Sequence, residues 1–111
     1  MGALAQSVRP VPQLSSRVID ETGTLTAVQS EALASKLAAL EKQTGAQLVV
    51  LIVETTTPED IAVFAQRVGD TWKLGRKDVG DGLLLLVAKK DRKIRIEVAK
   101  TLEGEIGRAH V

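Results

Sequence analysis

The sequence predicts an α/β domain with elements in the order β-α-β-α-β-β: a mostly parallel sheet with one antiparallel strand, and helices packed on the sheet. Three observations predict this class. Two aliphatic runs, residues 47–53 and 83–88, are typical of strands buried in a parallel sheet. Segments of helical periodicity precede each run, which is typical of β-α-β units. The length of 111 residues fits one domain.

The first sixteen residues are predicted to be a leader remnant followed by an extended arm. Ala3 and Ala5 match the small-residue pattern of a signal-peptidase site, which would make Gln6 the first mature residue. The polar stretch after Gln6 contains two prolines, at positions 10 and 12, and proline favours extended backbone before it. We therefore expect an exported protein.

A short strand over residues 17–20 is predicted to lead into a helix over residues 27–43. Thr26 can cap this helix, with Gln29 as its capping-box partner, and Gly45 can end it in a left-handed conformation. Spacings of four and three residues place three leucines on one face, which we expect to pack on the sheet: Leu33, Leu37 and Leu40.

Residues 47–53 are predicted to be the central strand, and residues 58–72 the second helix. Thr57 is the expected N-cap of that helix, with Pro58 in its first turn and Gly75 as its stop signal. An apolar stripe at helical spacing favours core packing of its side chains: Ile61, Phe64, Val68 and Trp72.

The last two predicted strands, residues 83–88 and 93–98, form a hairpin around the turn at residues 89–92. The second strand alternates Ile94, Ile96 and Val98 with Arg95 and Glu97. We expect the aliphatic side chains to face the core and the charged pair to face water.

Composition excludes several function classes. A net charge of +1 gives no electrostatic basis for binding nucleic acid, and two aromatic residues give little capacity for base stacking. The absence of cysteine excludes disulfides, thiolate metal sites and cysteine nucleophiles. The single histidine, His110, is the penultimate residue, which argues against a Ser-His-Asp triad or a multi-histidine zinc site. No apolar run approaches the ~18 residues of a membrane span.

Topology sorts the remaining polar residues between the two edges of the sheet. Glu54 and the turn at 89–92 are expected at the carboxyl edge of the parallel strands, and Asp78, Asp81 and Glu103 at the amino edge. Carboxylates beside free carbonyl groups in a glycine-rich loop can bind a hard cation such as Ca²⁺. The alternative is structural: glycines allow tight entry into the third strand, and the Asp81 carboxylate bonds nearby amides.

Several short motifs then resemble the TPM domain family in the same order. They are Val18-Ile19-Asp20 followed by Leu25, Trp72-Lys73-Leu74-Gly75, Gly80-Asp81-Gly82 with the leucines after it, Arg92 at the start of a strand, and Leu102-Glu103-Gly104. The family is known in bacterial exported or membrane-tethered proteins and in a plant thylakoid-lumen protein described as an acid phosphatase. The resemblance implies an α/β sandwich outside the cytoplasm and matches the acidic motifs to Asp20, Asp81 and Glu103, with Asp78 near them. For Asp20 a loop-bracing hydrogen bond is the alternative.

Two departures from the family pattern concern the acidic site. Val98-Ala99-Lys100-Thr101 stands where the family has a glycine-rich stretch, and Gly107-Arg108 where it tends to have an Asp. The family also continues into further helices. The resemblance therefore implies a single TPM-like domain over residues 17–106, truncated at its C-terminus, with a tail at residues 107–111. We expect an incomplete cover on the sheet, an exposed aliphatic patch and self-association.

Two functions follow as hypotheses. The first is an exported interaction or assembly module of the periplasm or cell envelope. It binds protein partners at the membrane and is tethered there by segments outside this sequence. It holds a divalent cation such as Ca²⁺ at Asp78, Asp81, Glu103 and Asp20. The alternative is a metal-assisted acid phosphatase in which Arg76, Lys77 or Arg92 stabilises phosphoryl oxygens. No organic cofactor is expected, and the sequence identifies no catalytic residue. A third possibility is a domain that only packs on its neighbours.

Overall fold

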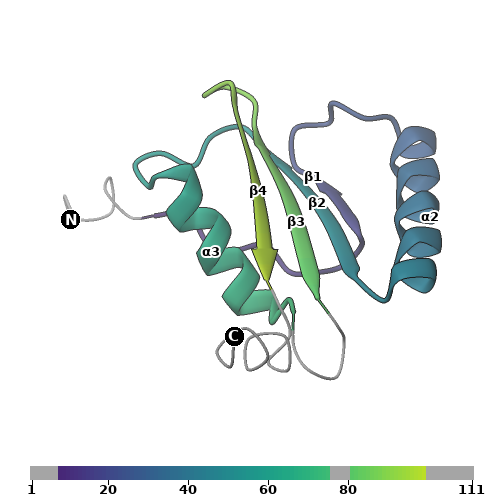
Figure 1. The fold of residues 1–111 in the computed structure, drawn as a ribbon. Coiled ribbons are helices and arrows are strands. Elements are labelled where there is room, and N and C mark those ends of the chain that lie inside the picture. Colours follow the sequence, from purple (N-terminus) through teal and green to yellow (C-terminus); the bar gives the residue numbers. More distant parts are fainter. Residues whose placement is uncertain (1–7, 76–80, 100–111) are drawn as a thin grey trace, which may run out of the picture.

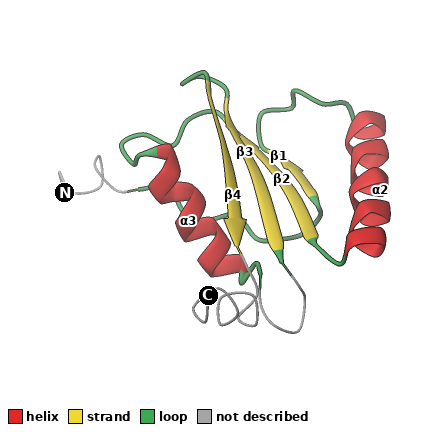
Figure 2. Ribbon diagram, in the orientation of Figure 1, coloured by secondary structure: helices red, strands yellow, loops and turns green. Residues whose placement is uncertain are grey.

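The computed structural model describes residues 8–75 and 81–99 (Figure 1). Four strands and two helices within these residues follow the predicted order, which confirms the α/β class (Figure 2). Their bounds are β1 Val18–Asp20, α2 Ala27–Thr44, β2 Gln47–Val53, α3 Ile61–Trp72, β3 Gly82–Ala88 and β4 Lys93–Ala99.

The four strands form one sheet in sequence order, β1-β2-β3-β4. The first three strands are parallel, and β4 is antiparallel to β3. Val50 on β2 lies between Val18 and Leu85 on the two neighbouring strands. β2 is therefore central, as predicted, and β4 forms one edge of the sheet.

The two helices cover opposite faces of the sheet (Figure 1). Leu33 and Leu37 of α2 pack against the face that carries Val50, whereas Phe64 of α3 packs against the face that carries Leu51. The β1-α2-β2 and β2-α3-β3 connections both step to the next strand in the same direction across the sheet. Two such connections of the same handedness would place both helices on the same face of the sheet. The two crossovers here therefore have opposite hands, and one is left-handed, against the strong preference for right-handed connections.

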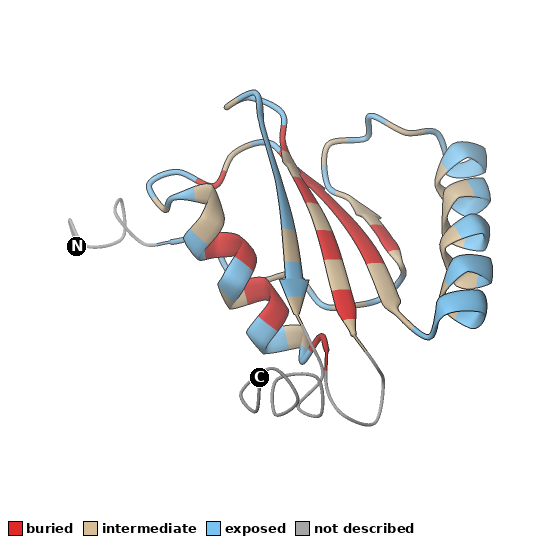
Figure 3. Cartoon of the chain, in the orientation of Figure 1, coloured by how far each residue is buried: buried red, intermediate tan, exposed pale blue. Residues whose placement is uncertain are grey.

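The main core lies between α3 and the sheet (Figure 3). Phe64 and Val68 are fully buried there against aliphatic side chains of β2 and β3 such as Leu51 and Leu84. The second core, under α2, is smaller, and no residue of α2 is fully buried. The fold is thus well covered on the α3 face and thinly covered on the α2 face.

Helix α2 begins and ends as its sequence predicts. The Thr26 side chain accepts a hydrogen bond from the Gln29 N–H, the Gln29 side chain accepts one from the Thr26 N–H, and Gly45 ends the helix with a φ of 78°. The expectation for Leu40 is wrong. Leu33 and Leu37 contact the sheet, but Leu40 is exposed, because the helix passes the end of the short strand β1.

Helix α3 begins three residues later than predicted. Its N-cap is Asp60, whose carboxylate accepts a hydrogen bond from the Ala62 N–H at 2.8 Å. Thr57 is not the N-cap, and the Thr57-Pro58 peptide bond is cis. The threonines before the helix instead bond within their own turn, where the buried Thr56 hydroxyl donates to the Glu59 carbonyl at 3.0 Å.

The helix also ends before Gly75, because Lys73 adopts the left-handed conformation with a φ of 58°. Gly75 has a different role. It has a φ of 75°, and a side chain there would lie 2.3 Å from the Ala99 carbonyl oxygen. Only glycine fits this approach, which brings the end of α3 against the last residue of β4.

The arm before β1 packs across the α3 side of the domain. The Trp72 indole N–H donates to the Pro12 carbonyl at 2.7 Å, and the Arg67 guanidinium donates to the Arg9 carbonyl at 2.6 Å. Both guanidinium groups lie over the Phe64 ring, at 5.5 Å for Arg9 and 5.2 Å for Arg67. Arg67 also forms a two-bond ion pair with Glu59, which raises the pKa of the guanidinium.

Strand β4 has the predicted alternation but the opposite orientation. Ile94, Ile96 and Val98 are 68%, 56% and 51% exposed. Arg95 and Glu97 lie on the α3 face of the sheet and pair with each other at 3.4 Å. The prediction that the aliphatic row faces the core is wrong. On that face the core under α2 takes in side chains of β1 and β2 and the half-buried Leu85 and Val87 of β3, and among the described residues it does not extend to β4.

Candidate functional site

Asp20, the first predicted cation ligand, braces the loop between β1 and α2. One carboxylate oxygen accepts the Thr22 N–H at 2.9 Å and the Thr22 hydroxyl at 2.6 Å, and the other accepts the Leu25 N–H at 2.7 Å. Burial alone would raise the pKa of this carboxyl group, but these hydrogen bonds outweigh burial and lower it below its ordinary value. The Asp20 carboxylate is thus committed to the loop, as the structural alternative expected.

Asp81, the second predicted ligand, lies at the amino edge of the parallel strands. Its carbonyl accepts the Gln47 N–H at 2.6 Å, and the following residue, Gly82, pairs with both Gln47 and Ala99. The backbones of Gly75 and Gly82 approach closely, since a side chain at Gly82 would lie 2.7 Å from the Gly75 nitrogen. The end of α3, the start of β3 and the end of β4 therefore converge at this edge.

The structure does not bring Asp20 and Asp81 together. Asp20 pairs with Ile52 near the carboxyl end of β2, whereas Gly82 pairs with Gln47 at its amino end. A rise of about 3.3 Å per residue over the five residues between these positions gives a separation of about 17 Å. One ion cannot contact both carboxylates, so Asp20 does not belong to a cation site at the amino edge.

The described residues do not include the two further predicted cation ligands, Asp78 and Glu103. They also do not include the predicted anion-binding residues Arg76 and Lys77. Among the residues that the structure does describe, no three acidic or histidine side chains form a group that could hold a metal ion. The cation site at the amino edge therefore stays a prediction.

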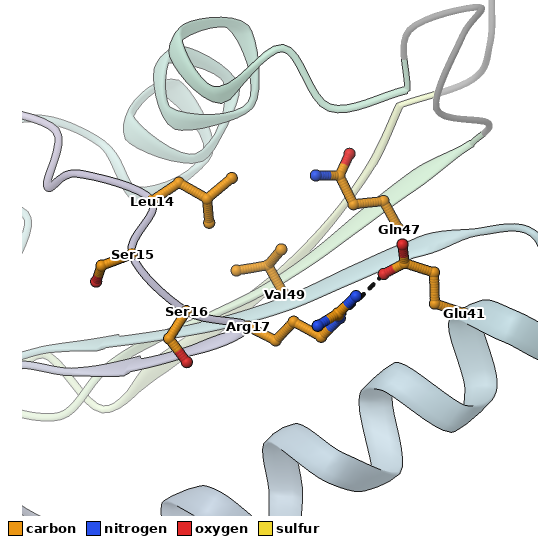
Figure 4. A pocket seen from close by; sticks show the side chains of 7 residues that line it. All are labelled: Leu14, Ser15, Ser16, Arg17, Glu41, Gln47 and Val49. Carbon is orange, nitrogen blue, oxygen red and sulfur yellow. Dashed lines mark hydrogen bonds and ion pairs between the residues drawn. The ribbon is translucent and has the colours of Figure 1, made fainter.

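A shallow cleft of about 240 Å³ opens at the same edge (Figure 4). The Arg17 guanidinium donates to the Glu41 carboxylate at 3.1 Å along one side, and the Gln47 side-chain oxygen is buried without a hydrogen-bond donor among the described residues. The full lining is Leu14, Ser15, Ser16, Arg17, Glu41, Gln47 and Val49. Among the described lining residues the two serine hydroxyls have no histidine or lysine beside them, so these residues give the cleft binding groups but no activated nucleophile.

The carboxyl edge holds a polar cluster that the sequence analysis missed. The Thr55 hydroxyl lies 2.8 Å from both oxygens of the Asp91 carboxylate, which also accepts the Thr56 N–H at 3.2 Å. The Lys90 N–H donates to the Glu54 carbonyl, which confirms that the turn and Glu54 share one edge. Arg92 has a φ of 56° and donates its N–H to the Lys89 carbonyl, so its backbone holds the hairpin turn.

A row of exposed and half-buried aliphatic side chains lies on the α2 face of β3 and β4. We call it the aliphatic face. Leu83, Leu85 and Val87 of β3 are half-buried, and Val98, Ile96 and Ile94 of β4 pair with them in register. Figure 3 shows β4 as the most exposed strand of the sheet. The alternation of residues 93–98 predicts that Ile94, Ile96 and Val98 share one face. Their exposure agrees with the expectation of an exposed aliphatic patch.

No helix among the described residues is long and apolar enough to cross a membrane.

Comparisons with known proteins agree with the fold and name the family. The solution NMR structure of the N-terminal domain of a protein from P. gingivalis is similar to this chain, with a TM-score of 0.73 and 25% sequence identity. The match covers 85% of this chain and 63% of that structure, so this chain spans less than two thirds of its length. No curated protein matches. The family model of the TPM domain matches residues 18–111, and the chain therefore belongs to the TPM domain family.

Proposed function

We propose that this TPM domain is an interaction module of an exported protein and that β4 forms its contact surface. The partner is a protein that presents aliphatic side chains of its own. The observation that carries the proposal is the exposure of Ile94, Ile96 and Val98, each more than half exposed in one row on an edge strand. A contiguous apolar row of this kind typically marks a protein contact.

The chemistry of this row favours a protein partner over a nucleic acid. The side chains are aliphatic and cannot stack on bases, and the net charge of +1 gives little attraction to phosphate. A protein strand or sheet face can bury all three side chains. Burying an exposed Val or Ile side chain completely contributes about 1.5–3 kcal/mol, so these three are a substantial source of binding free energy.

The cation remains part of the proposal as a feature of the amino edge. The convergence of Gly75, Gly82 and Ala99 supports it, because Asp81 is the residue before Gly82 and therefore lies at this meeting point of three chain segments. A carboxylate set there would hold a hard cation such as Ca²⁺. The metal-assisted phosphatase is the weaker alternative, since no described contact activates a nucleophile or a water molecule.

Export is proposed on the sequence of the N-terminus and on the family resemblance, and membrane tethering on the resemblance alone. The small residues at Ala3 and Ala5 precede an arm that the domain binds through Pro12 and Arg9. Cell fractionation of the protein in its own host tests this location, which an exclusively cytoplasmic protein would contradict.

Site-specific photo-crosslinking in the host cell tests the contact surface. A photoreactive amino acid at Ile94 is expected to give a covalent adduct with a protein. The same group at Val28 of α2 or Val63 of α3 serves as a matched control, because these valines are 78% and 53% exposed but lie outside the aliphatic face. Adducts of equal yield at all three positions, or none at Ile94, would refute the proposed surface.

Calcium titration followed by amide NMR tests the cation separately. We expect shifts at Asp81, Gly82 and Ala99 that Asp81→Asn abolishes. Asp20→Asn is the control, because Asp20 lies at the opposite edge and its substitution leaves those shifts in place. Spectra that do not change with Ca²⁺ would remove the cation from the proposal.

A further inference from the structure

We infer that the partner of β4 is a second copy of this chain, joined by antiparallel pairing of β4 with β4 about a two-fold axis at Ile96. The inference rests on the proposed function and specifies its partner. β4 is an edge strand, and within residues 8–75 and 81–99 no strand pairs with its outer side. Its outward N–H and C=O groups are therefore a template for another strand.

Symmetry limits the registers in which two copies can pair. A two-fold axis perpendicular to the sheet keeps the α3 faces of both copies on the same side, so each residue must pair with one whose side chain points to the same face. Near the middle of β4, the axis can then pass through Arg95, Ile96 or Glu97. Each choice gives a different set of opposed side chains.

Charge selects one of these three registers. An axis through Glu97 places two glutamates directly opposite each other. An axis through Arg95 does the same with two arginines, although it also places Lys93 opposite Glu97 of the second copy, so only the axis through Ile96 opposes unlike charges without a like pair. An axis through Ile96 places Arg95 opposite Glu97 of the second copy, twice by symmetry. Like charges directly opposite destabilise a strand pair and unlike charges stabilise it, so the axis lies at Ile96.

The same register also matches the aliphatic row. Ile96 lies opposite Ile96 of the second copy, and Ile94 lies opposite Val98. Directly opposed side chains have Cβ atoms about 4.5–5.5 Å apart, which puts these exposed groups in contact. One register therefore satisfies the backbone edge, the charges on the α3 face and the aliphatic side chains on the α2 face. The β4 strand is self-complementary.

A cysteine scan reads the register directly, because the chain has no cysteine of its own. Opposed residues of an antiparallel pair have Cα atoms about 4.5–5.5 Å apart, within the range of about 4.4–6.8 Å that a disulfide bridges. Under mild oxidation with diamide, we expect Ile96→Cys to give a disulfide-linked dimer. Ile94→Cys is the matched control, because its counterpart lies four residues away along the strand and stays unlinked. A dimer through Arg95→Cys or Glu97→Cys instead would overturn the register.

Charge exchange tests the same contact without a covalent trap. Sedimentation equilibrium from low micromolar to near-millimolar concentration is expected to show a monomer–dimer equilibrium. Arg95→Glu or Glu97→Arg replaces two attractive pairs with two repulsive ones and weakens the dimer about tenfold or more. The double exchange restores the dimer. Lys36→Glu on α2 makes the same change of charge away from β4 and leaves the affinity unchanged.

The remaining outcomes separate this inference from the proposed function. A monomer at every concentration overturns the second copy, and if Ile94 still crosslinks to another protein in cells, the interaction function stands. A third outcome is a dimer that Ile96→Lys abolishes but that charge exchange at Arg95 and Glu97 does not weaken. This outcome overturns edge-to-edge strand pairing and favours packing of two aliphatic faces against each other. A monomer with no crosslink overturns both. Circular dichroism of each variant checks that the fold is retained.

Discussion

Substituting Asp20 by asparagine tests whether this family-motif acid is a structural brace. Its carboxylate accepts three hydrogen bonds, from the Thr22 N–H, the Thr22 hydroxyl and the Leu25 N–H. Asn has one acceptor oxygen, and its NH₂ group would face at least one of these donors. Asp20→Asn therefore removes the charge and leaves a backbone N–H without its acceptor. Hydrogen bonds to charged groups contribute about 1.5–3 kcal/mol each, and we expect a loss of about 2 kcal/mol from this half-buried site.

The pH dependence of stability independently tests whether the Asp20 carboxylate stabilises the folded protein. Hydrogen bonds hold the pKa of Asp20 below its ordinary value of 3.8. The contribution of this carboxylate is therefore fully present above pH 3.8 and is lost as the pH falls through the lower folded-state pKa. The variant lacks a titrating group here, so the difference in unfolding free energy between the two proteins shrinks in that acidic range.

Urea unfolding at a series of pH values measures both quantities. Asp70→Asn makes the same chemical change at an exposed position of α3 and should alter the unfolding free energy by less than about 0.5 kcal/mol. Calcium is added in a second series. If Asp20 bound the ion, Ca²⁺ would stabilise the wild type and not the variant. That result, or an unchanged stability of Asp20→Asn at neutral pH, would refute the brace.

Three further substitutions probe the fold. Phe64→Ala removes the largest fully buried side chain and should cost about 3–5 kcal/mol in urea unfolding, whereas Val63→Ala, on the exposed side of the same helix, should cost under about 1 kcal/mol. Asp60→Ala removes the observed N-cap of α3 and should lower stability by about 1 kcal/mol in thermal unfolding; a larger loss from Thr57→Ala would restore the N-cap first predicted. Gly75→Ala should lower the melting temperature strongly because its methyl group would overlap the Ala99 carbonyl, and a neutral result would contradict the close approach at the amino edge.

Local signals in the sequence were sufficient for most elements but not for the start of α3. The capping box at Thr26 and the glycine at position 45 fixed α2 correctly, because both act within a few residues of the helix ends. Before α3, Thr57 and Asp60 both precede good helix residues. Asp60 caps the helix because the preceding threonines bond within their own turn and to Asp91, a residue distant in sequence.

The error over β4 has a different physical cause. Alternation shows which side chains share a face, but it does not show which face is covered. The cover depends on where α2 lies, and crossovers of the usual hand would have put both helices on one face. One crossover has the opposite hand, so α2 covers β1 and β2 on the other side and leaves Ile94, Ile96 and Val98 exposed.

The separation of Asp20 and Asp81 could have been derived from the sequence. Asp20 ends one predicted parallel strand, and Asp81 precedes another, so the two residues belong at opposite edges of the sheet. The family resemblance nevertheless led us to list Asp20 and Asp81 as ligands of one cation site. The Thr55–Asp91 cluster had no comparable signal, because it joins residues 36 positions apart through a turn whose shape the sequence does not specify.

The charges of β4 also distinguish pairing from its prevention. Proteins commonly protect an exposed edge strand with charges, especially lysine, because like charges repel a second copy in any register. β4 carries Arg95 and Glu97 two residues apart, and this pattern opposes two like charges when the axis passes through either residue, whereas an axis between them opposes only unlike charges. A strand that only needed to avoid pairing would carry two charges of the same sign at these positions. In the proposed dimer, the opposite signs of Arg95 and Glu97 therefore favour the register centred on Ile96.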